Sequence, residues 1–159
     1  MIHQYLIEDL IKEIENILKD IQTKNPSGET VVGVKGYEQA LPVIMDDEED
    51  ETQFFPYFIC RMAEGETDDD SNPWVDTVSI LIGVYDDDKQ KNGHRHIMTM
   101  IQRITDRFAK EPLLNKKFRA QEKMSFALQE PDPDTYPFFF GGVELKFSVP
   151  KIGRSDEWS

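Results

Sequence analysis

The chain has 159 residues, 31 of them acidic and 18 basic, which gives a formal net charge of −13. This length suits one domain with one hydrophobic core. The acidic balance argues against free-standing binding to DNA, RNA or an anionic membrane, because their phosphates would be repelled. Charge of this kind also keeps proteins soluble, so the composition alone does not decide between solubility and a more specific role.

Cysteine usage and hydropathy limit the kinds of site and the cellular compartment that we expect for this protein. Cys60 is the one cysteine of the sequence, so neither an intramolecular disulfide nor a multi-thiolate metal site can form. Its apolar surroundings predict a small core residue rather than a nucleophile. The first residues have the pattern of a helix that bears acids, so we expect no signal peptide, and no apolar run has membrane-spanning length. We therefore expect a protein of a reducing cytoplasm.

Two segments have the apolar spacing of amphipathic helices, and we expect these helices over residues 2–21 and 94–110. The apolar line of the first contains Ile2, Leu6, Leu10, Ile14, Ile17 and Ile21. The line of the second contains Ile97, Ile101, Ile104 and Phe108. Pro112 prevents the second helix from continuing.

Five segments have the alternation or apolar content of strands, and they cover residues 30–37, 54–63, 74–85, 118–128 and 138–149. The segment 74–85 has one wholly apolar face, so we expect it at the centre of a sheet. Segments 54–63 and 74–85 are joined by one loop, which predicts an antiparallel hairpin, and segments 118–128 and 138–149 predict a second. Asp76 and Glu144 interrupt these strands, and we expect both at the surface. Gly141 and Gly142 favour a bulge or bend over contact with a ligand.

The order of these elements, α-β-β-β-α-β-β, predicts the fold class α+β. We expect one domain over residues 1–152, with two helices packed on a mostly antiparallel sheet of about five strands. Residues 153–159 are expected to form a flexible C-terminal tail.

The sequence contains one weak candidate for a metal or catalytic site. His94 and His96 follow the acidic turn Asp86, Asp87 and Asp88, which invites a metal site. However, positions i and i+2 of a helix point to different faces, and acids before a helix favour its dipole without a metal. No nucleophile motif, phosphate-binding loop or dinucleotide fingerprint occurs. We therefore expect no enzyme, no cofactor and no metal.

Three surfaces are candidates for contact with other molecules. The run Tyr136, Phe138, Phe139 and Phe140 is either a partner surface or core packing, and the sequence leaves both open. The second helix carries a basic side with Arg95, Arg103, Arg107 and Lys110. Two acidic loops contain Asp46, Asp47, Glu48 and Glu49 in the first, and Asp68, Asp69 and Asp70 in the second. Such acidic blocks are expected to stay solvated.

Several stretches, from Val34 to Ile152, resemble a family of small prophage proteins. They are VKGYEQALP from Val34, PYFICRMAEGE from Pro56, ILIGVYDDD from Ile80, and DPDTYPFFFGGVELKFSVPKI from Asp132. The family is encoded among the head–tail joining and tail genes of long-tailed bacteriophages, and the order of elements is similar to that of tail terminator (tail completion) proteins.

This resemblance implies a homo-oligomeric ring, usually of six copies, that caps the finished tail tube and stops its growth. The implied partners are other copies of the chain, the tail-tube protein and the head-connector protein. DNA would pass the bore without specific binding, helped by acidic walls. The implied location is the bacterial cytoplasm during assembly and then the head–tail junction of the virion. A head-completion or connector protein of the neck is the alternative, and a metal enzyme using Asp86–Asp88 with His94 and His96 is a further one.

A ring needs heterologous contacts, in which one patch meets a different patch of the next copy. We expect the basic side of the second helix to meet the acidic loops in this way.

Overall fold

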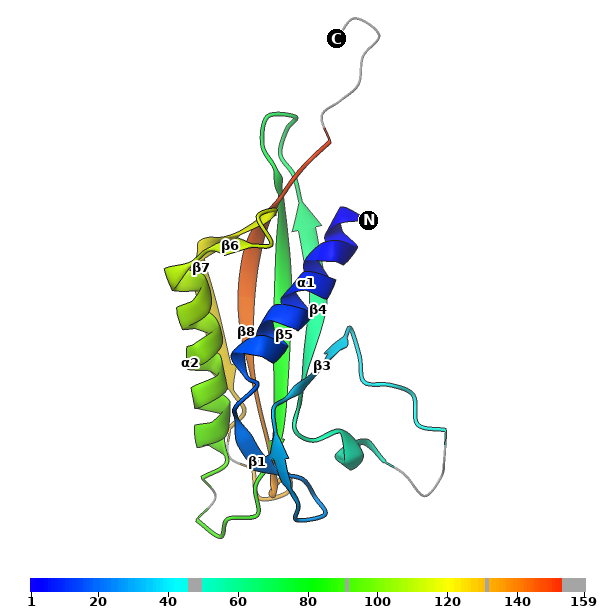
Figure 1. Cartoon of the computed structure of the whole chain (residues 1–159), viewed down its shortest axis with the longest axis vertical. Helices are drawn as coiled ribbons and strands as arrows, with labels where there is room; N and C mark the ends of the chain where they lie inside the picture. Colours follow the sequence, from blue (N-terminus) through cyan, green and yellow to red (C-terminus); the bar gives the residue numbers. More distant parts are fainter. Residues whose placement is uncertain (46–49, 91, 131, 153–159) are drawn as a thin grey trace, which may run out of the picture.

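A computed structural model of the chain describes residues 1–45, 50–90, 92–130 and 132–152. Two helices, α1 (Ile2–Ile17) and α2 (His94–Lys110), lie on the same face of one sheet, as Figure 1 shows. A short 3-10 helix, η1 (Glu51–Phe54), comes directly before the strand Tyr57–Glu66 in the chain. This arrangement confirms the predicted α+β class.

The described residues contain eight strands. They are β1 (Gln22–Lys24), β2 (Thr30–Val32), β3 (Lys35–Glu38), β4 (Tyr57–Glu66), β5 (Trp74–Tyr85), β6 (Leu113–Leu114), β7 (Phe118–Leu128) and β8 (Phe138–Val149). Their order is β2-β1-β5-β8-β7-β6, and β4 with β3 branches from β5. All pairs are antiparallel except β3 with β4. Both predicted hairpins, β4–β5 and β7–β8, are confirmed.

The three additional strands come from the start of the chain and from the connection after α2. The predicted strand 30–37 is divided at Gly33, whose φ of 90° only glycine adopts readily. The predicted helix 2–21 ends four residues early, at Ile17. A turn follows, in which the Ile21 amide donates to the Leu18 carbonyl, and the Ile21 carbonyl then accepts a hydrogen bond from the Gly33 amide at 2.7 Å as the chain enters β1. β6 contributes only two residues.

The main core lies between the helices and the sheet. The central strand β5 buries Val78, Ile80, Ile82 and Val84 against it, as its alternation predicts. From α2 the core receives Ile97, Met100, Ile101, Ile104 and Phe108. Gly36 on β3 and Gly141 on β8 allow close approach, since a Cβ there would lie 2.2 Å from the Phe58 ring and 2.4 Å from Ile97 respectively.

The second face of the sheet, which we call the outer face, has a smaller aromatic cluster. It is built on the buried Phe55, Tyr57 and Ile59, with half-buried neighbours Tyr37, Leu41, Phe54, Leu81, Tyr85, Phe138 and Phe140. The outer face is therefore covered at one end, near η1, and open elsewhere.

One surface prediction is wrong. Asp76 lies on the core face of β5 and is fully buried, because it has the same parity along the strand as Val78 and Ile80. Its Oδ2 lies 2.5 Å from Nδ1 of His3 on α1, and the His3 ring packs edge-on against Trp74. Asp76 Oδ1 has no hydrogen-bond partner within the described chain. Glu144, the other acid in question, is exposed on the outer face, as expected.

Candidate functional site

The acidic turn before α2 uses its carboxylates locally. Asp86 Oδ1 accepts a hydrogen bond from the Asp88 amide, and Asp88 Oδ1 accepts one from the Gln90 amide. His96 Nε2 lies 3.2 Å from Asp86 Oδ2, while His94 is exposed. Within the described ranges no group of three or more His, Cys, Asp or Glu side chains could hold a metal ion. The histidine and aspartate pair alone does not make a metal centre.

The basic side of α2 is partly used within the chain. Arg103 Nη1 donates to Asp20, and this hydrogen bond lowers the pKa of the Asp20 carboxyl. Arg107 Nε donates to Glu13 Oε1 at 2.9 Å, and its other nitrogens donate to the Glu111 and Leu113 carbonyls. These two arginines therefore tie α2 to α1 and to β6. Arg95 and Lys110, the other two predicted interface cations, are exposed.

The second acidic loop forms the end of the β4–β5 hairpin, at the top of Figure 1. We call Glu64, Glu66, Asp68, Asp69 and Asp70 the acidic tip; all five are exposed. Asp69 Oδ1 accepts hydrogen bonds from the Ser71 and Asn72 amides, which fixes the turn. Lys151 Nζ reaches the tip from the end of β8 and donates to the Asp69 carbonyl at 2.6 Å and to Thr67. Asp46, Asp47, Glu48 and Glu49 lie outside the described residues.

A second cluster of charge, which sequence reasoning missed, lies where α2 ends and β7 begins. We call its cations the basic corner: Lys110, Lys116, Lys117, Arg119 and Lys123, all exposed. Only two acids, Glu111 and Glu122, occur in the same stretch of a strongly acidic chain. The signal was present in the sequence as five cations within fourteen residues.

The aromatic run divides between the two faces of the sheet. Phe138 and Phe140 contact Phe55 in the aromatic cluster of the outer face, with ring centroids 4.7 and 5.7 Å apart. Phe139 points to the helix side and packs against the main core. The Tyr136 hydroxyl donates to the Asp87 carbonyl at 2.7 Å, and burial together with the Asp87 charge raises the pKa of this phenol. All four rings are half-buried, so core packing accounts for part of each and leaves part for contact.

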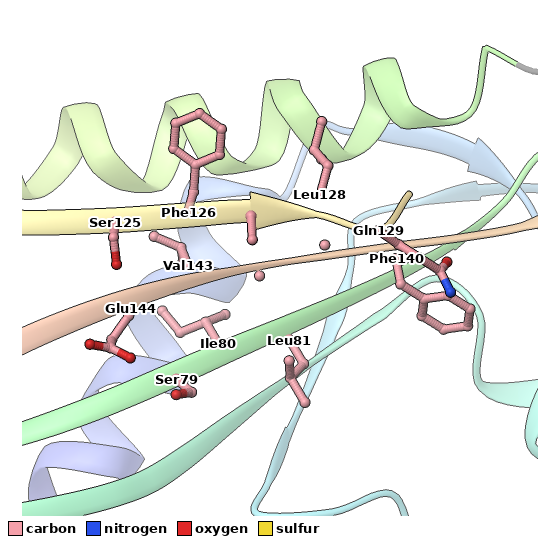
Figure 2. A pocket seen from close by; sticks show the side chains of 13 residues that line it. Ser79, Ile80, Leu81, Ser125, Phe126, Leu128, Gln129, Phe140, Val143 and Glu144 are labelled. Carbon is pink, nitrogen blue, oxygen red and sulfur yellow. The ribbon is translucent and has the colours of Figure 1, made fainter. Parts of the chain in front are cut away.

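A shallow groove crosses the open part of the outer face, as Figure 2 shows. Gly141 and Gly142 form its floor, with Leu81 and Phe140 on one side and residues 125–129, at the end of β7 and just after it, on the other. The predicted bulge at these glycines is absent from both ladders, since Gly142 pairs regularly with Leu81 and with Ala127. The groove has one carboxylate, Glu144, and no converging acid and base that would suggest catalysis.

No protein-family model matches the chain, and no curated protein matches it. Neither helix in the described part of the chain has the length and apolar character needed to cross a membrane.

Proposed function

We propose that the chain is a structural subunit that joins copies of itself into a closed ring, and that this ring terminates a bacteriophage tail tube and joins it to the head. The resemblance of the sequence to tail terminator proteins supports the second part. The separation of the acidic tip from the basic corner is the observation that supports the first.

Head-to-tail association needs two unlike patches on one subunit. Copies with a net charge of −13 repel one another overall, so a contact in which a cation-rich surface meets an acid-rich one is favoured over a contact between like surfaces. The basic corner supplies five cations and the acidic tip five acids. Within the described residues no ion pair joins the two patches, and Lys151 is the cation that reaches the tip.

Contact between the basic corner of one copy and the acidic tip of the next differs from the contact expected from the sequence, in which the basic side of α2 meets the acidic loops. Reversing Arg103 or Arg107 would break their contacts with Asp20 and Glu13 inside the subunit, so loss of assembly could not be assigned to the interface. The exposed Lys116 and Lys117 carry no such ion pair in the described chain and make a cleaner test.

The experiment uses two charge-reversed chains and their mixture. Lys116→Glu/Lys117→Glu has acids on both patches, and Asp68→Lys/Asp69→Lys has cations on both. Each should fail to form rings alone, measured by light scattering after size exclusion. A one-to-one mixture should assemble again, because alternating copies restore every contact in a ring with an even number of subunits.

A matched control is Lys12→Glu/Lys19→Glu, which reverses one exposed cation on α1 and one in the turn that follows it, and should assemble like the wild type. Assembly of either patch variant alone at the wild-type level would overturn the charge pairing. Wild-type chain that stays monomeric at every concentration, also in the presence of tail tubes, would overturn the ring.

A further inference from the structure

The strand β7 has an open edge along residues 124–128. On one side these residues pair with residues 141–145 of β8. On the other side β6 pairs only with Phe118 and Arg119, so no strand of the described chain lies beside residues 124–128. None of these five residues is charged, although 31% of all residues in the chain are. An uncharged edge of this kind is a template for the addition of another strand, because no charge opposes its desolvation.

Alternation along β7 decides which backbone groups of this edge are free. The Gln129 amide donates to the Phe140 carbonyl at 3.0 Å, so the backbone of Gln129 faces β8. In an antiparallel ladder the backbone groups of successive residues face opposite sides, so those of Phe126 and Leu128 face away from β8. Within the described ranges no backbone or side-chain group outside β7 bonds to them there. The edge therefore offers two amides and two carbonyls to an extended chain.

The side chains beside the open edge are apolar or small. Phe126 and Leu128 point to the helix side and Ser125 to the outer face, as Figure 2 shows. The Phe126 side chain is 59% exposed. Met98 of α2, 44% exposed, lies on the side of the helix away from Arg103, which contacts α1. Because α2 lies over β8 and β7 and α1 lies over β3 and β4, this side of α2 is the one above the open edge.

The other edges of the described sheet do not match the edge of β7. At the β3 edge the Gly36 amide donates to Glu15 Oε2 at 3.1 Å, and the Glu38 carbonyl accepts from the Ala40 amide, so both groups are already used. The open second half of β4 belongs to the acidic tip, and β2 has only three residues. Pairing of β7 with β7 of another copy would need a two-fold axis, whereas the copies of a ring that caps a tube all point in one direction.

We propose that residues 124–128 of β7 bind an extended segment of a different protein, which adds to the sheet as a further strand. The segment carries no charged side chain, exchanges hydrogen bonds with the backbone of Phe126 and Leu128, and places an apolar side chain beside Phe126 and Met98. The choice of a different protein over a second copy rests on the proposed function. The edge lies outside the acidic tip and the basic corner, so a ring closed by those patches leaves it free.

A synthetic peptide tests the site. The probe is an acetylated and amidated heptapeptide of alternating valine and threonine, which has no charge and favours an extended backbone. Binding is followed by amide hydrogen exchange, read at single residues by NMR or by fragmentation in a mass spectrometer. At saturating peptide the amides of Phe126 and Leu128 should exchange at least about tenfold more slowly, because both become hydrogen-bonded. The same peptide with glutamate in place of valine should bind at least several-fold more weakly.

Two variants at one residue separate the backbone from the side chain. Phe126→Pro removes the outward amide and no bond to β8, and should lower the affinity for the peptide about tenfold, as expected for the loss of one or two hydrogen bonds. Phe126→Glu keeps the amide, places a charge beside the bound segment, and should lower the affinity several-fold. The matched control is Val32→Glu, at a 61% exposed position of the edge strand β2, which should bind the peptide like the wild type.

The outcomes keep this site apart from the ring. Absence of saturable protection at Phe126 and Leu128, or equal loss of affinity in Phe126→Glu and Val32→Glu, would overturn the proposal and leave the ring standing. Protection of these two amides without peptide, rising with the concentration of the chain, would overturn it in favour of a second copy. Normal peptide binding by a chain that never forms rings would overturn the proposed function and leave the peptide site standing.

Discussion

Removing His3 should destabilise the subunit through the buried Asp76. The Asp76 side chain is fully buried, its Oδ2 lies 2.5 Å from His3 Nδ1, and its Oδ1 has no partner in the described chain. His3 is therefore the group that compensates the burial of this carboxylate. In His3→Ala the carboxylate would remain without a partner.

The expected loss follows from the cost of an unpaired buried charge. Removing one partner of a fully buried pair costs about 3–5 kcal/mol. The His3 side chain is 39% exposed, so water reaches one side of the pair and the loss should lie nearer ~2 kcal/mol. That would still be a large part of the ~5–15 kcal/mol by which domains are stable.

A double-mutant cycle separates this cause from simple loss of packing. His3→Ala, Asp76→Val and the double variant are unfolded in urea and followed by far-UV circular dichroism. Because Asp76→Val removes the carboxylate, His3→Ala in that background should cost less than about 1 kcal/mol. An equal cost of His3→Ala in both backgrounds would refute the reasoning, as would an effect below about 0.5 kcal/mol in the wild type.

Two further predictions concern the helices and the thiol. Arg107→Ala should lower the free energy of unfolding by about 1–2 kcal/mol, because it removes the half-buried ion pair with Glu13 and two hydrogen bonds to carbonyls. The control Arg95→Ala, at an exposed position of the same helix, should cost little. Equal urea midpoints for the two variants would contradict this expectation. Cys60 should not react with Ellman's reagent at pH 8 in the folded chain, because burial raises the pKa of its thiol and keeps the thiol away from solvent. In urea it should react fully. Fast reaction of the folded chain would contradict this and would show that the core opens.

The long elements could be read from the sequence because their patterns are strong. β5, β7, β8 and α2 have the predicted bounds, since alternation over about a dozen residues, or an apolar stripe over four turns, leaves little choice of structure. The short strands β1 and β6 carry no such pattern. They exist because of pairing with β2 and β7, which is a tertiary effect.

The contacts of the candidate interface residues were harder to predict, because they too depend on tertiary structure. The contacts of Arg103 with Asp20 and of Arg107 with Glu13 join residues more than eighty positions apart, and nothing in their local sequence indicates them. Asp76 is different, because its parity with Val78 was visible and a carboxylate on a core face should have suggested a buried partner. The open edges of β4 and β7 become visible only once the strand order is known.

The mass of the particle that the purified chain forms, measured by light scattering after size exclusion, tests the central claim most directly. The account predicts a closed species of fixed mass, near six times the 18.5 kDa of one chain, that does not grow with concentration. A monomer at all concentrations and on tail tubes, a two-fold dimer, or an open series of ever larger particles would contradict it.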